Sequence, residues 1–490
     1  MKTLMKSSFY LMLFVLLYSC DSTDPDPGEA PVDGVDPAEV AIQDYMWKGM
    51  NNYYLWQSNV PLLSDSRFAT QTDLTNFLGG KPDIAGFFYD DLVYDYGIQD
   101  RFSWVVDEYI ALEESFQGTS LSNGLQFGLF VLDNSGQVYG VIRYVAPDSD
   151  ASGKDIQRGE VFNRVNGTSL NVNNYQSLLF GQDNYTLGFV DFNGGAPIEN
   201  SKELSFVKSE YTENPVLISK VLDVEGEKVG YLMYNAFISN FDGALNQAFA
   251  GLKADGAEHL VLDLRYNGGG SVRSASYLAS MVTGQFAGEV FTEERWNSKL
   301  MDGYFNTLPQ EERDARLKTL FPSEIGSDGQ MIQSLGLEKV YVITTSSTAS
   351  ASELIINGLL PYIDVTVVGD QGVGKFVASV TLYDSDDFTR NGDNLASHTY
   401  AMQPIILEEV NALGENNGVE GFVPDVQLRE NYGNMGVLGE ISEPLLNAAL
   451  SQIVSFAKGA RVMQSRVETT PIGESTQGMK TYQNMYIELN

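Results

Sequence analysis

The sequence predicts a multidomain α/β protein, and three observations support this prediction. The chain has 490 residues, which is too long for one ordinary hydrophobic core. From about residue 215, strand-like and helix-like segments alternate, which predicts a largely parallel sheet covered by crossover helices. Before that point the apolar pattern changes from helical to short-strand spacing. With 43% hydrophobic and 19% charged residues, each domain has the composition to bury a core.

The N-terminus is expected to be a targeting segment. Two lysines precede an apolar run over residues 9–18, which is too short to span a membrane as a mature helix. The sequence LYSC ends this run at Cys20, the only cysteine of the chain, and resembles the bacterial lipobox, whose thiol is lipidated. An ordinary secretory signal is the alternative. We therefore predict a signal peptide over 1–19, lipidation of Cys20, an acidic Pro/Gly-rich tether over 20–38, and a location in the bacterial cell envelope, in the periplasm or on the outer surface.

Two small units are predicted after the tether. Residues 39–108 are predicted to form a small helical domain, because AIQDYMWKGMNNYYLW places apolar side chains from Ile42 to Tyr53 at helical intervals. Residues 109–210 are predicted to form a mainly β module, because GLQFGLFVLD, QVYGVIRYV, EVFNRVNGTSL and YTLGFVDF are brief strands with Asn166-Gly167 as a turn.

The core is predicted over residues 211–456. Its strands are KVGYLMY, HLVLDLR, KVYVITT and VTVVGD, and its helices include DGALNQAFAGLKADG, SVRSASYLASMVTG and ASELIINGLL. In such parallel sheets, sites form beyond the carboxyl ends of the strands. Residues 457–490 are expected to be a polar, loosely attached tail.

The charge balance excludes one class of partner. There are 65 acidic and 30 basic side chains, a formal net charge of −35, and no local basic patch is evident. Such a field repels phosphate backbones, so we expect no nucleic-acid binding and interpret the acidity as a solubility feature.

Two loops at strand ends carry residues suited to chemistry. DLRYNGGG, residues 263–270, ends in three glycines that leave backbone N–H groups unobstructed. TTSSTASASELIINGLL, residues 344–360, brings hydroxyls to a helix N-terminus, where developing negative charge is favoured. Together these loops predict a nucleophile with an oxyanion hole. From the residues alone, four serines remain candidates (Ser346, Ser347, Ser350 and Ser352), and Ser350 with Glu353 also fits a helix capping box.

The base for such a serine is more plausibly a lysine than a histidine. His259 and His398 are the only histidines, which leaves few candidates for a histidine-centred triad. In VVGDQGVGKFVAS, Lys375 follows two glycines and has apolar neighbours that exclude water. Desolvation can lower a lysine pKa from about 10.4 to about 7.5, which makes a neutral amine available as a base. A surface lysine in a glycine-rich turn is the alternative.

These motifs resemble the C-terminal processing, or tail-specific, serine peptidase family. LDLRYNGGG, TASASEL and GVGK occur in the family's order, with Lys375 lying 25 residues after Ser350. The resemblance implies a crotonase- or ClpP-like core, Ser350 as nucleophile and Lys375 as general base. It also implies oxyanion donors at the N–H of Ala351 and of one glycine, Gly269 or Gly270. Many family members carry glutamine four residues after the lysine, whereas this chain has Ser379, a shorter candidate for orienting the amine.

The mainly β module is similar to a PDZ domain of this family. The resemblance places the peptide-binding loop and strand at GLQFG, that is Gly124, Leu125, Gln126, Phe127 and Gly128. It implies capture of protein or peptide substrates, with free C-termini as the expected ligands.

The sequence therefore favours a serine endopeptidase acting through Ser350 and Lys375, attached to the membrane only through a lipid anchor and needing no metal or organic cofactor. The alternative is a non-catalytic envelope protein that uses the same fold to bind peptides. A crotonase-like acyl enzyme is disfavoured, because the serine and lysine at this spacing would then be coincidental.

Overall fold

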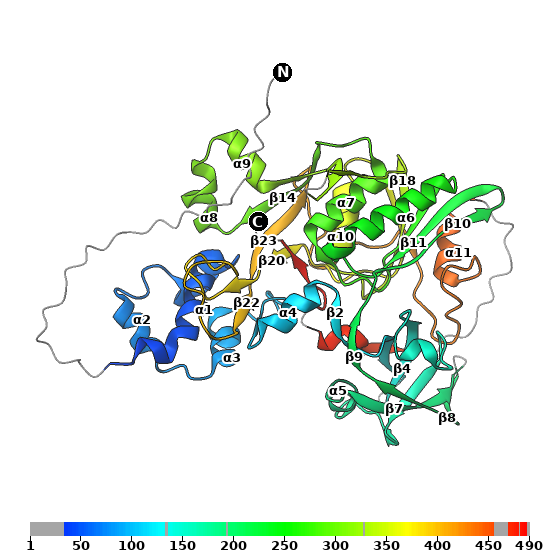
Figure 1. Cartoon of the computed structure of the whole chain (residues 1–490), viewed down its shortest axis with the longest axis horizontal. Helices are drawn as coiled ribbons and strands as arrows, with labels where there is room; N and C mark the ends of the chain where they lie inside the picture. Colours follow the sequence, from blue (N-terminus) through cyan, green and yellow to red (C-terminus); the bar gives the residue numbers. More distant parts are fainter. Residues whose placement is uncertain are drawn as a thin grey trace, which may run out of the picture.

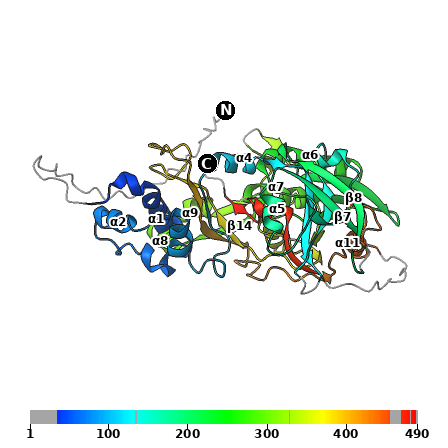
Figure 2. The ribbon, with the colours of Figure 1, turned by 90° about the horizontal axis from the view of Figure 1, so that it is seen from below.

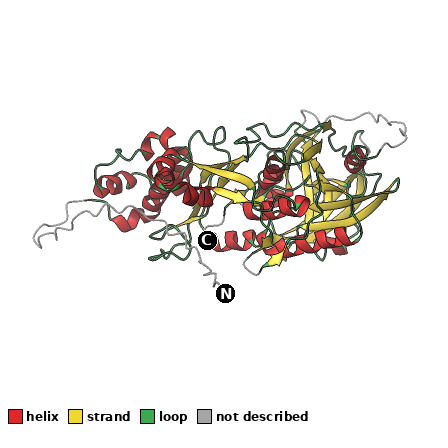
Figure 3. Ribbon diagram, turned by 90° about the horizontal axis from the view of Figure 1, so that it is seen from above, coloured by secondary structure: helices red, strands yellow, loops and turns green. Residues whose placement is uncertain are grey.

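The computed structural model describes residues 34–132, 136–192, 195–326, 329–454, 469–479 and 481–487. The predicted signal peptide, Cys20 and most of the tether therefore lie outside the described residues. Figure 1 shows a helical unit at one end, an α/β core, and a β module beneath the core. Figure 3 shows that helices dominate the first end and strands the other. No helix in the described ranges has both the length and the apolar character needed to cross a bilayer.

The helical unit forms around α1 (Ala41–Tyr53), whose inward-facing side chains include Tyr45, Met46 and Met50. This confirms the helical spacing predicted there. The other elements of the unit are η1 (Pro37–Val40), η2 (Gln57–Asn59), η3 (Pro61–Leu63), α2 (Gln71–Leu78), α3 (Ile84–Gly86), η4 (Phe87–Leu92), β1 (Trp104–Val106) and α4 (Tyr109–Phe116).

Contacts cross the predicted boundary between the helical unit and the core. Strands β21 (Leu382–Tyr383) and β22 (Ala401–Gln403) belong to the core by sequence, yet β22 pairs with β1. The Tyr45 hydroxyl bonds to the main chain of these strands, and the Phe388 ring stacks on Tyr45 with a centroid separation of 6.2 Å. The helical unit is therefore packed firmly against a hairpin from the core (Figure 2).

The core contains the predicted parallel sheet. In the order β10-β11-β12-β18-β19-β24, only β10 runs antiparallel to its neighbour. Helices α6, α7 and α10 bury one face, and α11 buries the other, as expected for crossover connections. The bounds are β10 (Val216–Val224), β11 (Glu227–Tyr234), β12 (His259–Asp263), β18 (Lys339–Thr344), β19 (Asp364–Gly369), β24 (Val426–Gln427), η6 (Ser239–Phe241), α6 (Asp242–Ala254), α7 (Val272–Thr283), α10 (Ala351–Leu359) and α11 (Pro444–Leu450).

A second sheet in the core has the order β13-β26-β20-β23-β14-β15. Its strands are β13 (Gly270–Ser271), β14 (Val290–Trp296), β15 (Lys318–Leu320), β20 (Val377–Ser379), β23 (Ile405–Asn411) and β26 (Met485–Tyr486). Three short helices and one hairpin flank it: α8 (Ser298–Gly303), η7 (Phe305–Thr307), α9 (Gln310–Leu317), β16 (Glu324–Ile325) and β17 (Gln330–Met331). Both β13 and β20 continue from the loops that carry the predicted site.

The β module has its own hydrophobic core and the sheet order β25-β3-β4-β5-β7-β8. Asn166 and Gly167 both have positive φ between β5 and β6, which confirms the predicted turn. Strands β2 (Thr119–Ser122) and β9 (Ser209–Thr212) pair as the connection to the core. The remaining elements are β3 (Leu125–Val131), β4 (Val138–Val145), η5 (Ala151–Gly153), β5 (Val161–Val165), β6 (Thr168–Ser169), α5 (Tyr175–Phe180), β7 (Asn184–Asp191) and β8 (Ile198–Val207).

The expectation of a loosely attached C-terminal tail is wrong for the described residues. Residues 469–479 and 481–487, hereafter the C-terminal segment, form β25 (Thr470–Glu474), η8 (Ser475–Gly478) and β26. Strand β25 pairs with β3 of the β module, whereas β26 lies inside the second sheet of the core. Met485 is fully buried in the main hydrophobic cluster. The sequence did not predict these strands, because each contains too few apolar residues to form a recognisable period.

Candidate active site

Ser350 occupies a strained position at the start of α10. Its backbone has φ 68° and ψ −122°, a positive φ that is uncommon outside glycine. The side chain is fully buried, and its hydroxyl makes no hydrogen bond to any described residue. The Ser350 backbone N–H donates to the Glu353 carboxylate at 3.0 Å, which is one half of a capping box. The hydroxyl itself is left free for other chemistry.

The neighbouring hydroxyls anchor the loop. Thr348 Oγ1 donates to the Leu264 carbonyl at 2.9 Å, and Ser352 Oγ donates to the Asn267 carbonyl at 3.0 Å. Ser347 Oγ donates to Glu474 at 2.6 Å. Ser346 is exposed. Among the four candidate serines, the structure therefore isolates Ser350 as the buried hydroxyl without a partner.

The glycine loop lies directly against Ser350. A Cβ on Gly269 would meet the Ser350 Cβ at 2.6 Å and its Oγ at 2.8 Å, so no side chain fits there. The Gly269 N–H donates to Asn267 Oδ1 at 2.9 Å and is thus already engaged. This corrects the expectation for Gly269 and leaves Gly270 as the glycine candidate. Ala351, the first residue of α10, is the second oxyanion candidate.

Lys375 is almost completely buried, with 2% of its surface exposed. Burial lowers its pKa to about 7, and Arg101 acts in the same direction while Asp100 and Glu353 oppose it. Its Nζ lies 4.6 Å from the centre of the Phe102 ring and donates to the Gln483 carbonyl at 2.9 Å. The environment therefore favours the neutral amine that a general base requires.

Glu353 connects the loops of the serine and the lysine. Its Oε2 accepts the N–H of Ser350 at 3.0 Å and the N–H of Lys375 at 2.9 Å, and its Oε1 accepts the N–H of Gly374. Burial raises the pKa of Glu353, although these N–H groups oppose the shift. Gly372 is required beside it, because a Cβ there would lie 2.8 Å from Oε1. One buried carboxylate thus brings the two loops together.

Sequence reasoning missed three parts of this environment. Asp100 and Phe102 reach Lys375 from the helical unit, where Asp100 accepts the Tyr54 hydroxyl at 2.8 Å. Gln483 reaches it from the C-terminal segment. Arg143 of the β module donates to Ser347 at 3.0 Å. These residues are far apart in sequence, so no local pattern predicted that they meet.

Ser379 does not orient the amine in this structure. Its Oγ donates to Asn484 Oδ1 and to the Met485 carbonyl, both at 3.1 Å, because β20 lies beside β26.

The two histidines contact carboxylates outside the candidate site. His259 lies at the beginning of β12 near Glu227, and His398 contacts Asp384 at 2.9 Å. No three His, Cys, Asp or Glu side chains in the described ranges are grouped as metal ligands would be.

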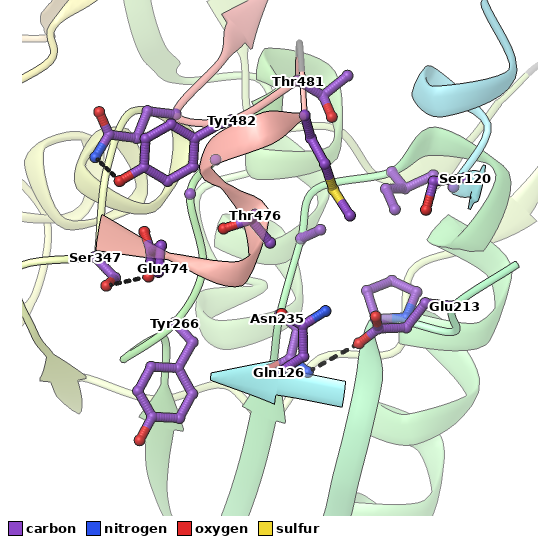
Figure 4. Close-up of a pocket in the computed structure, with 18 of the residues that line it drawn as sticks. Ser120, Gln126, Glu213, Asn235, Tyr266, Ser347, Glu474, Thr476, Thr481 and Tyr482 are labelled. Atoms are coloured by element: carbon purple, nitrogen blue, oxygen red, sulfur yellow. Dashed lines mark hydrogen bonds between the residues drawn. The ribbon is translucent and has the colours of Figure 1, made fainter. Parts of the chain in front are cut away.

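The five residues predicted to bind peptide, 124–128, lead into and form the first part of β3. In the structure, the edge of β3 pairs with β25 of the same chain. The Phe127 N–H donates to Ser475 Oγ at 3.1 Å. Beside this pairing lies a cavity of about 140 Å³, lined by the β module, the glycine loop and the C-terminal segment (Figure 4). Its lining includes Gln126, Arg143, Gly269, Ser347, Glu474 and Gln483.

Comparisons with known proteins agree with the motifs. Residues 228–427 match the model of peptidase family S41. Ser350, Lys375 and the glycine loop all lie within this stretch. Residues 228–427 therefore form a peptidase S41 domain.

Relatives within the S41 family are distant. The chloroplastic C-terminal processing peptidase of Tetradesmus obliquus is 26% identical over 318 residues, covering 62% of this chain and 61% of that protein. A carboxyl-terminal-processing protease of Picosynechococcus is 25% identical over 252 residues, 51% of either chain. The chain thus spans about three fifths of the length of the algal peptidase.

Solved structures support the same S41 fold. The crystal structure of a protein assigned to the S41 proteases of Bacteroides fragilis superimposes with a TM-score of 0.62 and 24% sequence identity. The superposition covers 87% of this chain and 99% of that chain. It therefore extends well beyond the stretch matched by the family model.

Proposed function

We propose that this protein is a serine endopeptidase of the cell envelope that uses a dyad of Ser350 and Lys375. One observation carries the proposal: a buried, unpartnered serine hydroxyl and a buried lysine lie on loops whose N–H groups bind the same Glu353 oxygen. The pKa of about 7 for Lys375 supports its role as a base at neutral pH.

The reaction begins with proton transfer. Neutral Lys375 removes the Ser350 proton as Oγ attacks the carbonyl carbon of a peptide bond. The N–H groups of Ala351 and Gly270 stabilise the oxyanion, with support from the N-terminus of α10. The protonated amine then protonates the leaving nitrogen. Water hydrolyses the acyl-enzyme, again with Lys375 as the base, and restores the free serine.

Substrates are captured by the β module, which we propose to be a PDZ-like domain. An extended peptide would pair with the edge of β3 (residues 125–131) in the place that β25 takes in this structure. Free C-termini of proteins are the proposed ligands. The predicted lipid anchor at Cys20 would hold the enzyme in the bacterial envelope, on a face that substrates reach after export.

The proposal is tested by cleavage of a peptide library with the soluble chain from residue 21 onward. Ser350→Ala and Lys375→Ala serve as the inactive pair, and each protein is assayed from pH 6 to pH 10. We expect wild-type cleavage that rises through pH 7, and loss of at least a thousandfold in both variants. Matched peptides with free and amidated C-termini test the specificity of capture.

The outcome separates catalysis from peptide binding. If wild type binds library peptides but cleaves none of them, the protein is a peptide-binding member of the fold, and the dyad proposal is wrong. If Lys375→Ala retains activity, another base operates.

A further inference from the structure

The C-terminal segment occupies the same path that the proposed function assigns to substrate. It contacts both ends of this path: the edge of β3 in the β module and the two loops of the candidate active site. In Figure 1 the red C-terminal elements lie between the β module and the core.

At the capture end, β25 pairs antiparallel with β3. The register places Thr470 opposite Val131 and Glu474 opposite Gly128. Such pairing uses the main-chain groups that a bound peptide would need. The edge of β3 is therefore unavailable to a second peptide while β25 is in place.

Between the two ends, Glu474 binds the C-terminal segment to the β module and to the serine loop. Its carboxylate forms a buried ion pair with Arg143 of the β module and accepts the Ser347 hydroxyl from the loop before Ser350. Figure 4 shows Ser347 directed at Glu474 on the wall of the cavity. Burial alone would raise the pKa of Glu474, but Arg143 and Ser347 hold this pKa below its usual value. The carboxylate is thus ionised and well bound.

At the catalytic end, β26 enters the second sheet between β13 and β20. The Gln483 carbonyl accepts the Lys375 amine at 2.9 Å, so the base is directed at the segment. The Asn484 carbonyl and Ser350 Oγ both lie close to Gly269. A Cβ on Gly269 would be 2.6 Å from the Asn484 carbonyl oxygen and 2.8 Å from Ser350 Oγ. Within the part of the chain that the structure describes, no residue forms a hydrogen bond with the Ser350 hydroxyl.

We propose that the C-terminal segment is a built-in competitor of substrate, which blocks the β3 edge and holds Lys375 until an extended peptide displaces it. This inference rests on the proposed function of the site. It predicts that substrates enter by exchange for β25, and that peptides presenting a carboxylate to Arg143 and Ser347 exchange best.

The test is a reversible disulfide that links β25 covalently to β3. The soluble chain from residue 21 contains no cysteine, so Thr470→Cys with Val131→Cys introduces the only two thiols. Directly paired residues of antiparallel strands lie within disulfide range. Cleavage of a library peptide and binding of a labelled peptide with the sequence of residues 469–487 are measured before and after reduction. We expect peptide cleavage and peptide binding to be at least tenfold weaker in the oxidised than in the reduced variant. The reductant should change neither quantity in wild type.

Loosening the segment provides the opposite perturbation. Glu474→Ala removes the ion pair with Arg143, and we expect cleavage and peptide binding to rise severalfold. Gln477→Ala, at an exposed position of the same segment, is the matched control and should behave as wild type. Thermal unfolding and far-ultraviolet circular dichroism verify that each variant is folded.

The two readouts distinguish the two proposals. If the oxidised and reduced proteins cleave and bind equally, the segment is not a competitor, whereas the dyad still stands. If binding depends on the disulfide but no form cleaves any peptide, the competitor role holds and the peptidase proposal fails.

Discussion

Replacing Lys375 with methionine is expected to stabilise the protein at neutral pH, and to do so less as the pH rises. Methionine keeps an unbranched stem of similar size but carries no charge. Lowering a lysine pKa from 10.5 to about 7 means that the fold disfavours the protonated amine by about 5 kcal/mol. Removing the amine abolishes this cost.

The sign of the pH dependence follows from proton counting. Between pH 7 and pH 10.5 the unfolded chain binds the Lys375 proton and the folded protein does not, so wild-type stability increases with pH in this window. The cost of the lysine is roughly 4 to 5 kcal/mol at pH 6.5 and roughly 1 to 2 kcal/mol at pH 9.5. The advantage of the variant should therefore shrink by about 3 kcal/mol between these values. The lost hydrogen bond to Gln483 shifts both values by a similar amount, about 1 kcal/mol.

Urea unfolding measures this difference. Ser350→Ala is the common background, because it prevents self-digestion and leaves the lysine in place. The single variant and the double variant Ser350→Ala with Lys375→Met are compared at pH 6.5 and pH 9.5. A stability difference that stays constant between these pH values would refute a buried, neutral Lys375 and the base assigned to it.

Three further changes test other parts of the site. Gly269→Ala should reduce cleavage more than a hundredfold in a steady-state assay, because its Cβ would lie 2.6 Å from the Ser350 Cβ at a φ of 107°; activity near wild type would contradict the close approach. Glu409→Gln should raise the unfolding midpoint at pH 8 but not at pH 4.5. Burial and the facing Glu294 raise the pKa of Glu409, so wild-type stability falls as the pH rises above the ordinary carboxyl pKa. A midpoint difference that is independent of pH would contradict a raised pKa for Glu409. Phe102→Leu should move the rising limb of the pH–activity profile to lower pH by about 0.3 pH units, because the aromatic ring stabilises the protonated Lys375. An unchanged limb would show that the ring contact does not affect the pKa of Lys375.

The sequence by itself determined the local elements and the loops that carry the chemistry. Periodic apolar residues predicted α1 and α6, and alternating strands and helices predicted the parallel sheet, because these patterns report which face of each element is buried. The glycine loop, the serine-rich stretch and Lys375 could be identified because each follows directly after a strand, and strand ends share one edge of a sheet.

Only the tertiary structure decided which of these groups meet. The choice of Ser350 over its neighbours depends on hydroxyls bonded to loops some 80 residues away, such as Thr348 to Leu264. The pKa of Lys375 depends on its burial and on the nearby charges of Asp100 and Arg101, which come from the helical unit far away in the sequence. The C-terminal strands were missed because two or three apolar residues carry no periodic signal of their own. Such a strand is stabilised by the partners that it finds across the fold, and these long-range contacts are absent from any local pattern.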